Sequence, residues 1–276
     1  MAAAATLAGI GVIPTSCATF DVVWSKLVPL AAAMLLLEQP LNRLASRRGS
    51  NWQCLAAFVV GAVGSVVGAF AGWAAVRSGA WLGPEGYKIA GAITASYIGG
   101  SVNMAATAAA LGLASPALVA GAAAADNVVM GVYIAGCAAI GVAEIARSAR
   151  AAGRAGPSPF AGAGELGGVL MLLFFATIGA TAGGWRALAD APALLLYCGV
   201  QVGVHLAFTL AVGRALKLPL RAVLVASNAN VGGPATAAAM ASGRGWSDLV
   251  QPGLLTGALG YTVGTVIGLA VARLLM

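Results

Sequence analysis

The sequence has few charged residues: Asp, Glu, Lys and Arg together make up 8% of its 276 positions. A soluble domain carries roughly 25% charged residues, so a water-soluble globular fold is excluded. Cysteine occurs four times without a Cys-x-x-Cys pair, and histidine occurs once. These numbers give no support to a disulfide framework or a zinc site, and the cysteines are expected to be small buried hydrophobic residues.

Sequence motifs of the common enzyme classes are also missing. There is no P-loop, no His-Glu-x-x-His motif and no Gly-x-Ser-Gly to pair with the single histidine. Gly99-Gly100-Ser101 resembles a nucleophile turn only superficially. We therefore expect that the protein is not an enzyme and that it needs no cofactor or metal site, apart from a sodium ion discussed below.

Apolar residues and glycine are abundant instead. Hydrophobic residues make up 60% of the chain, glycine occurs 39 times, and the mean hydropathy is +0.92. The net charge of +7 does not indicate nucleic-acid binding, because the basic residues lie singly between apolar runs, as loop charges of membrane proteins do. The composition predicts an integral, multi-pass membrane protein whose partner is the lipid bilayer.

Apolar stretches of about 20 residues can cross a bilayer core about 30 Å thick. On this basis we predict an all-α membrane protein of about eight transmembrane helices. Their predicted ranges are 22–38, 53–76, 88–112, 116–143, 166–183, 191–213, 219–241 and 249–275. Residues 1–13 are apolar but too short to span, and are expected to be the end of a helix whose beginning is absent.

An internal repeat relates the two halves at a constant offset of 133 residues. It aligns Gly99-Gly100 with Gly232-Gly233, and Ala105-Ala106 with Ala238-Ala239. The predicted units are 1–146 and 165–276, joined by a charged, Gly/Pro-containing loop at 147–164. Each unit is expected to contain one helix that is interrupted by a Gly-Gly pair.

Polar residues surround both Gly-Gly pairs. Glycine and proline favour unwinding of a helix, and unwound backbone at membrane depth persists where it is buried or lines a wet cavity. Paired interruptions in matching halves indicate a transporter site, whose half-helix N-termini suit an anion. The predicted site residues are Tyr97, Gly99, Gly100, Ser101, Asn103, Ser227, Asn228, Asn230, Gly232, Gly233 and Thr236. The alternative is close helix packing through the glycines.

Asp126 is the one acidic residue that lies well inside a predicted span, and Asn127 follows it. An ionisable residue at the bilayer centre costs at least about 2.5 kcal/mol on insertion scales. We predict that Asp126 and Asn127 bind a coupling ion, either sodium or a proton. An Asp that is kept only for packing is the alternative.

His205, the single histidine, lies in the predicted span 191–213. A hydrogen bond between helices is the simpler role for it, with Gln201 one turn earlier as a candidate partner. A proton relay is the alternative.

Four motifs in the chain resemble the YjcL-type membrane proteins, a family of unknown function. The motifs are Tyr97-Ile-Gly-Gly-Ser-Val-Asn, Ala125-Asp-Asn-Val-Val-Met, Leu173-Phe-Phe-Ala-Thr-Ile-Gly-Ala and Ala226-Ser-Asn-Ala-Asn-Val-Gly-Gly-Pro-Ala-Thr-Ala. The paired broken helices are more distantly similar to sodium–glutamate symporters. Members of the family begin with further helices and carry extra ones at the position of loop 147–164.

Four spans per unit would give both units the same orientation, whereas an inverted repeat needs an odd number. Either the repeats are parallel or the chain is a shortened version of the family. On an eight-span path, the loop 147–164 and the C-terminus share the more basic side, which is expected to be cytosolic.

These features predict a secondary transporter, a symporter of a small anionic or zwitterionic organic solute that is coupled to sodium or protons. The alternative is a non-transporting scaffold or assembly factor with a shortened transporter fold. A passive channel is less compatible, because no acidic rings are present. Whether the chain is a monomer or a homodimer, and whether it lies in a plasma membrane or a plastid or other organelle membrane, is left open.

Overall fold

The computed structural model describes residues 2–27, 30–31, 33–34, 48–77, 79–151 and 192–276, with scattered positions between 162 and 180. All regular secondary structure in these residues is helical. Among them, four helices are long and apolar enough to cross a membrane. They are α5 (Arg48–Ala75), α8 (Pro116–Ala151), α11 (Pro192–Ala215) and α14 (Ser247–Leu275).

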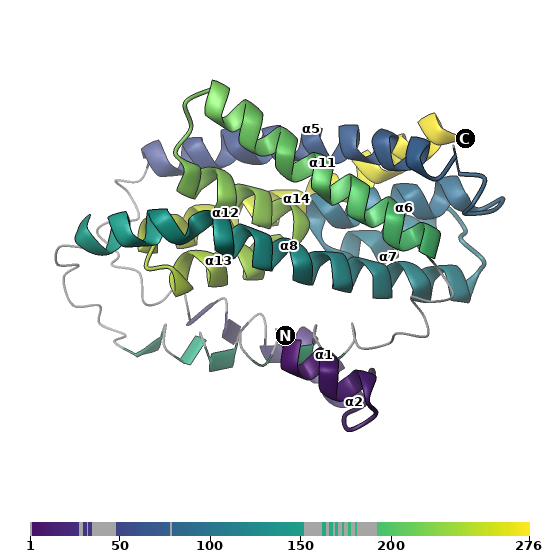
Figure 1. Ribbon diagram of the computed structural model, residues 1–276, viewed down its shortest axis with the longest axis horizontal. Coiled ribbons are helices and arrows are strands. Elements are labelled where there is room, and N and C mark those ends of the chain that lie inside the picture. The colour runs from purple at the N-terminus through teal and green to yellow at the C-terminus, as the bar shows by residue number, and fades with distance from the viewer. Residues whose placement is uncertain are drawn as a thin grey trace.

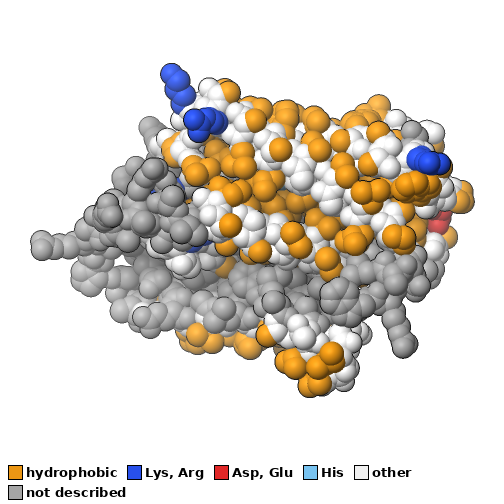
Figure 2. Space-filling view, viewed as in Figure 1, with side chains coloured by type: hydrophobic (Ala, Val, Ile, Leu, Met, Phe, Trp, Pro, Cys, Tyr) orange, Lys and Arg blue, Asp and Glu red, His pale blue; other side chains and the backbone are white. Residues whose placement is uncertain are grey.

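The four long helices lie roughly alongside one another, with their ends at the two ends of the molecule (Figure 1). Figure 2 shows that, on the face drawn, basic side chains gather at these two ends and a band of apolar and uncharged atoms lies between them. This distribution is typical of a protein that spans a bilayer. The short helices α1 (Ala2–Gly9) and α2 (Ala18–Val22) lie beside the main bundle in the same view.

Four shorter helices form two pairs. The first pair is α6 (Gly86–Gly99) with α7 (Ser101–Ala110), and the second is α12 (Leu220–Val231) with α13 (Gly233–Gly243). In each pair the two helices are antiparallel and side by side, so that each pair is a helical hairpin (Figure 1).

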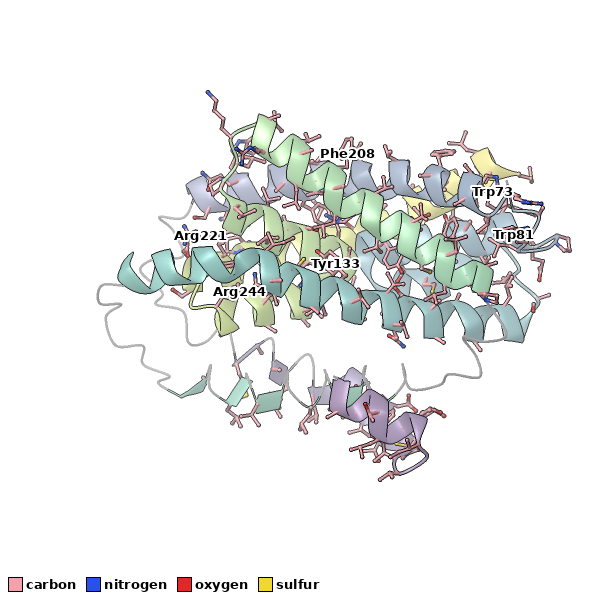
Figure 3. All side chains as sticks on the ribbon, viewed as in Figure 1. Trp73, Trp81, Tyr133, Phe208, Arg221 and Arg244 are labelled. Carbon is pink, nitrogen blue, oxygen red and sulfur yellow. The ribbon has the colours of Figure 1, made fainter. Side chains whose placement is uncertain are left out.

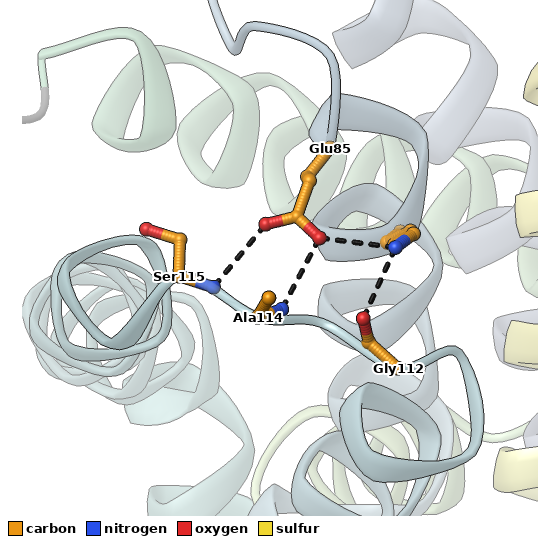
Figure 4. A network of polar contacts seen from close by, with 5 residues as sticks. Glu85, Gly112, Ala114 and Ser115 are labelled. Carbon is orange, nitrogen blue, oxygen red and sulfur yellow. Dashed lines mark hydrogen bonds and ion pairs between the residues drawn. The ribbon is translucent and has the colours of Figure 1, made fainter.

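The open end of the first hairpin is closed by Glu85 and Lys88. Lys88 Nζ donates hydrogen bonds to Glu85 Oε1 (3.0 Å) and to the carbonyl of Gly112 (3.1 Å). The Glu85 carboxylate also accepts from the backbone N–H groups of Ala114 (3.1 Å) and Ser115 (3.2 Å), as Figure 4 shows. These donors, the Lys88 side chain first, hold the pKa of Glu85 below its ordinary value. The chain therefore leaves α7 at the end where it entered α6.

The second hairpin is closed in a similar way. Arg221, at the start of α12, forms an ion pair of 3.3 Å with Asp248, which lies just beyond the end of α13. Further along, the Thr236 hydroxyl donates to Asn228 Oδ1 across the hairpin (2.6 Å).

The predicted ranges 88–112 and 219–241 are therefore not single crossings. Gly100 has φ 81° and ψ 174°, and Gly233 has φ 81°. These backbone conformations suit glycine and end the preceding helix, so the chain reverses instead of continuing. Since the hairpins return to the end where they began, the count of eight membrane-crossing helices is not supported.

The other predictions differ less from the structure. The ends of helices α5, α11 and α14 lie within five residues of the predicted bounds, and α8 continues to Ala151. Residues 23–27 of the predicted span 22–38 form a π-helical turn after α2. Residues 30, 31, 33 and 34 of that span and the described positions of 166–183 are helical, and the remaining positions of both ranges lie outside the described residues. Three of the cysteines, Cys54, Cys137 and Cys198, are buried and all four are free.

Glycines on α5 allow it to pack closely on α11. A Cβ added at Gly64 would lie 3.2 Å from the carbonyl of His205, and one at Gly72 would lie 3.0 Å from the carbonyl of Tyr197. The contacts run in opposite directions along the two helices, so α5 and α11 are antiparallel. The glycines of α5 at positions 61, 64, 68 and 72 thus form a packing face toward α11.

Helix α14 packs against both hairpins through its own row of glycines. Gly260 lies against the backbone of Ile98 and Gly99, and Gly257 lies against Pro234. Further along, Gly268 packs on Gly91 and Ala95 of α6, and Ala272 lies against Gly91. The C-terminus is therefore at the end where α6 begins, opposite to the end of α8. The prediction that loop 147–164 and the C-terminus share one side is wrong for this reason.

Candidate functional site

The tips of the two hairpins meet at one aromatic side chain, Tyr261 of α14. A Cβ added at Gly100 would lie 3.4 Å from Tyr261 Cε1, and one added at Gly233 would lie 3.6 Å from the Tyr261 hydroxyl. The Tyr261 side chain is 47% exposed. Two glycine breaks that are far apart in the sequence are thus within reach of one ring, and the hairpins enter from opposite ends of the bundle.

A helix begins at each tip. The N–H groups of the first turn of α7, starting at Ser101, and of α13, starting at Gly233, have no partners within their own helix. Together with the helix dipole they form an environment that favours an anion. Ser101 is exposed, whereas Gly233 is buried.

Other predicted site residues hold the hairpin turns in place. Asn103 Nδ2 donates to the carbonyls of Gly99 and Gly260, both at 3.1 Å, and Asn103 Oδ1 accepts from the Thr265 hydroxyl at 3.0 Å. With three hydrogen bonds, Asn103 joins α7 to α14. Its side chain has little capacity left for a solute.

Asn228 and Thr236 have the same kind of role in the second hairpin. The Thr236 hydroxyl bonds to Asn228 Oδ1 and approaches the carbonyl of Gly233 (3.1 Å), while Asn228 Nδ2 points to the sulfur of Met240 (3.7 Å). Thr236 also lies against Gly232, where an added Cβ would collide with its hydroxyl. These contacts favour a packing role at these positions.

Asp126 of α8 is 5% exposed and lies against the first hairpin. Its Oδ2 accepts a hydrogen bond of 3.0 Å from the Ser96 hydroxyl, and the Tyr97 ring lies beside the carboxylate. Within the described part of the chain, Asp126 Oδ1 and the Tyr97 hydroxyl are both buried without a hydrogen-bond partner. Asn127, the next residue on α8, is half-buried.

A second polar cluster is centred on His205 of α11. His205 Nδ1 lies 2.9 Å from both the carbonyl of Gly61 and the hydroxyl of Ser65, and Nε2 lies 2.9 Å from the hydroxyl of Ser227. The Ser227 hydroxyl is also 2.7 Å from the hydroxyl of Tyr133. His205 therefore joins α5, α11, α12 and α8.

The carbonyl of Gly61 can only accept, which assigns the proton of the neutral imidazole to Nδ1. Nε2 then accepts from Ser227, and Ser227 accepts from Tyr133. The hydrogen bonds have one consistent direction, from Tyr133 through Ser227 to His205. The prediction of a helix-joining histidine fits this arrangement, but the partner differs from the one expected.

Gln201, the partner expected for His205, bonds elsewhere. Gln201 Nε2 donates to the carbonyl of Ser65 and to the hydroxyl of Thr94, both at 3.1 Å. Asn230 Nδ2 donates to the carbonyls of Phe58 and Ala226. In the described part of the chain, the amide oxygens of Gln201 and Asn230 are buried and unpartnered.

Sequence reasoning missed the roles of Ser65, Tyr133 and Tyr261, whereas Ser96 belongs to the polar residues around the first Gly-Gly pair. The three missed residues lie among apolar residues and glycines, a pattern that many membrane helices show. Only Tyr261 carried a hint, because it follows the glycine that aligns with Asn127 in the repeat.

An apolar pocket of about 490 Å³ lies away from the tips, lined by Trp81, Leu82, Leu118, Pro192, Ala193, Leu194 and Leu196. It is at the end of the bundle where α8 and α11 begin. No predicted site residue lines it.

Helical architecture, apolar spans and buried polar clusters define a polytopic membrane protein. Its sequence matches the family described as a protein of unknown function (DUF819) over residues 1–158 and 153–276, and the chain belongs to this family. It is 30% identical to the uncharacterized membrane protein YjcL of Bacillus subtilis (strain 168), over 97% of this chain and 86% of that protein. The resemblance to YjcL-type proteins is confirmed. No solved structure matches.

The alignment with the relative is 351 residues long, more than the 276 of this chain. The relative therefore has residues that this chain lacks. The two segments that match the family meet at residues 153–158, inside the loop 147–164.

Proposed function

We propose that the protein is a secondary carrier of a small anionic or zwitterionic organic solute, coupled to sodium or protons. The observation that carries this proposal is the meeting of the two hairpin tips at Tyr261. Irregular backbone within a bilayer is tolerated where it lines a protected cavity. Discontinuous helices that meet near the midplane are the common construction of carrier binding sites.

The packing of α5 on α11 supports an inverted repeat. At the offset of 133, Gly64 corresponds to Tyr197 and Gly72 corresponds to His205. The repeat therefore maps the observed contact between Gly64 and His205 onto the observed contact between Gly72 and Tyr197. Equivalent helices that are antiparallel and make exchangeable contacts fit two copies that are related by an axis in the membrane plane.

The hairpins also offer an answer to the parity problem. In each proposed copy the hairpin adds no crossing, which leaves two long helices and the predicted span 22–38 or 166–183. Three crossings per copy would orient the copies in opposite directions. An inverted repeat then requires no additional helix and no parallel arrangement.

The solute is proposed to bind between the tips, with its negative group toward the first turns of α7 and α13. Gly100 and Gly233 would let the solute approach the backbone, and the exposed Ser101 hydroxyl would supply a further contact. Tyr261 would cover the site from α14. Asn103, Asn228 and Thr236 would act indirectly, by fixing the shape of the turns.

The coupling ion is proposed to bind at Asp126. Its Oδ1 atom and the Tyr97 hydroxyl are neighbouring buried oxygens, which a sodium ion or a proton would satisfy. Because Tyr97 is three residues before Gly100, an ion bound at Asp126 would directly affect the conformation of the first tip. Asn127 is proposed to assist on the same helix.

A thermal-shift screen of the purified protein tests this proposal. Organic anions and zwitterions are added in sodium, in potassium and at several pH values, and the melting temperature is measured. At least one solute should stabilise the protein, more strongly with its coupling ion, because a ligand that binds only the folded state raises its stability. If no solute shifts the melting temperature under any condition, the scaffold alternative is favoured and the carrier proposal fails.

A further inference from the structure

The end of α13 carries an arginine that is stacked on a buried tryptophan. Arg244 Cζ lies 4.9 Å from the ring centroid of Trp246, and the Trp246 side chain is fully buried. Figure 3 shows Arg244 beside α8, toward the end of the bundle where Arg221 also lies. The stacking restricts the orientation of the guanidinium.

Both residues have a buried N–H donor without an acceptor in the described part of the chain: Arg244 Nη1 and Trp246 Nε1. Leaving a buried donor unpaired costs about 1–3 kcal/mol, and more when it is charged. Two such donors on stacked neighbours are uncommon in folded proteins, and an acceptor from outside the chain would satisfy both.

The described neighbours do not supply a negative charge. Tyr133 and Cys137 of α8 face the guanidinium. The Tyr133 hydroxyl takes part in the series of hydrogen bonds that ends at His205, and Asp248 forms an ion pair with Arg221. The described side chains that face the guanidinium thus carry no negative charge, and the site is walled by α8 and α13; the next acidic position on α8 after Cys137 is Glu144.

The surrounding charge favours anions. The same end of the bundle carries six further basic positions, Arg48, Arg147, Arg150, Arg214, Lys217 and Arg221, against the acidic positions Glu144 and Asp248, whereas Arg77, Lys88 and Arg273 lie with Glu85 at the opposite end. A local excess of one sign raises the concentration of counter-ions and speeds their association.

We propose that Arg244 and Trp246 form an anion site for a carboxylate or phosphate group at the end of α13. The guanidinium would pair with two oxygens of the anion and the indole N–H would donate to one of them. The site is about one helix length from the tips, and its existence does not depend on transport. The group can belong to a soluble anion or to a lipid headgroup, since the site lies where the bundle meets the membrane surface.

The test is the binding of defined anions to the purified full-length protein by calorimetry and thermal shift. One arm titrates inorganic phosphate and succinate at constant ionic strength, with chloride as the reference. The other arm compares nanodiscs of phosphatidylcholine with and without phosphatidic acid. Saturable binding is expected in one arm, and that arm identifies the source of the group.

Three variants locate the effect. Arg244→Gln should abolish the binding, and Trp246→Phe, which keeps the ring but removes the N–H, should weaken it about tenfold. Arg77→Gln is the matched control, because Arg77 stacks on Trp81 in the same way (5.3 Å) but is exposed. It should bind as the wild type does.

Three results would overturn the proposal: no probe binds the wild type, Trp246→Phe binds every probe with unchanged affinity, or Arg77→Gln loses binding as Arg244→Gln does. Trp246→Phe keeps the test decisive if Arg244→Gln does not fold. Loss of transport at the tips with intact phosphate binding would leave this site standing, so the two proposals fail separately.

Discussion

The hydroxyl of Tyr261 lies 3.6 Å from the position that a Cβ at Gly233 would occupy, and the same ring also lies against Gly100. A side chain of α14 thus marks the point where the two hairpins converge. We therefore expect substitutions at Gly100 and Gly233 to disturb the tips more than substitutions at the polar residues around them.

Replacing Gly100 or Gly233 with alanine should lower stability by about 1–3 kcal/mol, because the backbone conformation strains any residue with a Cβ. There is room for the methyl group, so the effect comes from φ and not from a collision. Thermal unfolding in detergent measures it.

Gly199→Ala is the control for this pair. Gly199 lies within α11 with open space around it, so alanine should be neutral or stabilising by up to about 1 kcal/mol. Leucine at Gly100 or Gly233 should in addition abolish solute binding while the protein stays in the membrane. Normal binding by both leucine variants would show that the tips serve packing alone.

Ser227→Ala should destabilise the protein by about 1–3 kcal/mol, since it leaves His205 Nε2 without a donor and the Tyr133 hydroxyl without an acceptor. Tyr133→Phe should cost less, about 0.5–1.5 kcal/mol, because the bond from Ser227 to His205 remains. Chemical or thermal unfolding of both variants measures which of them loses more stability.

Thr262→Ala, at an exposed position of α14, should change little and controls for the loss of a hydroxyl. A larger cost for Tyr133→Phe than for Ser227→Ala would contradict the assigned direction of the hydrogen bonds.

Glu85→Gln should weaken the open end of the first hairpin. Because the hydrogen bonds lower the pKa of Glu85, its contribution is complete above the ordinary value of 4.5 and is lost as the pH falls through the lowered value. The variant should therefore melt below the wild type at neutral pH and approach it in acid. A melting difference that does not depend on pH would mean that the charge of Glu85 has no part in closing the hairpin.

Many of the helices could be predicted from the sequence, because the length of an apolar run decides whether it can form a membrane-spanning helix. The ranges of α5, α11 and α14 follow from runs bounded by Pro, Arg and Gly. The hairpins could not be predicted in this way: the residues of α6 and α7 are as apolar as those of a crossing helix. The reversal depends on φ at Gly100 and on the closure of the open end by Glu85 and Lys88, contacts that have no signature in hydropathy.

The candidate site, too, could be predicted from the sequence only in part. Polar clustering identified the tips and Asp126, since charge and amide groups are rare in such a chain. It did not separate Asn103, Asn228 and Thr236, which hold turns, from residues with unsatisfied oxygens, because that distinction depends on partners from other helices. Tyr261 was missed for the same reason.

The central claim is that Asp126 couples an ion to solute binding at the tips. The most direct measurement is solute binding to reconstituted protein over ranges of sodium concentration and pH, for the wild type and for Asp126→Asn. The substitution keeps the size of the side chain and lets Ser96 still donate to its oxygen, but it removes the charge and the titration.

The wild type should bind the solute more tightly as either sodium or acidity is raised, and Asp126→Asn should bind it with an affinity that neither variable changes. Its melting temperature should stay close to that of the wild type. Identical binding curves for the two proteins would contradict the coupling role of Asp126.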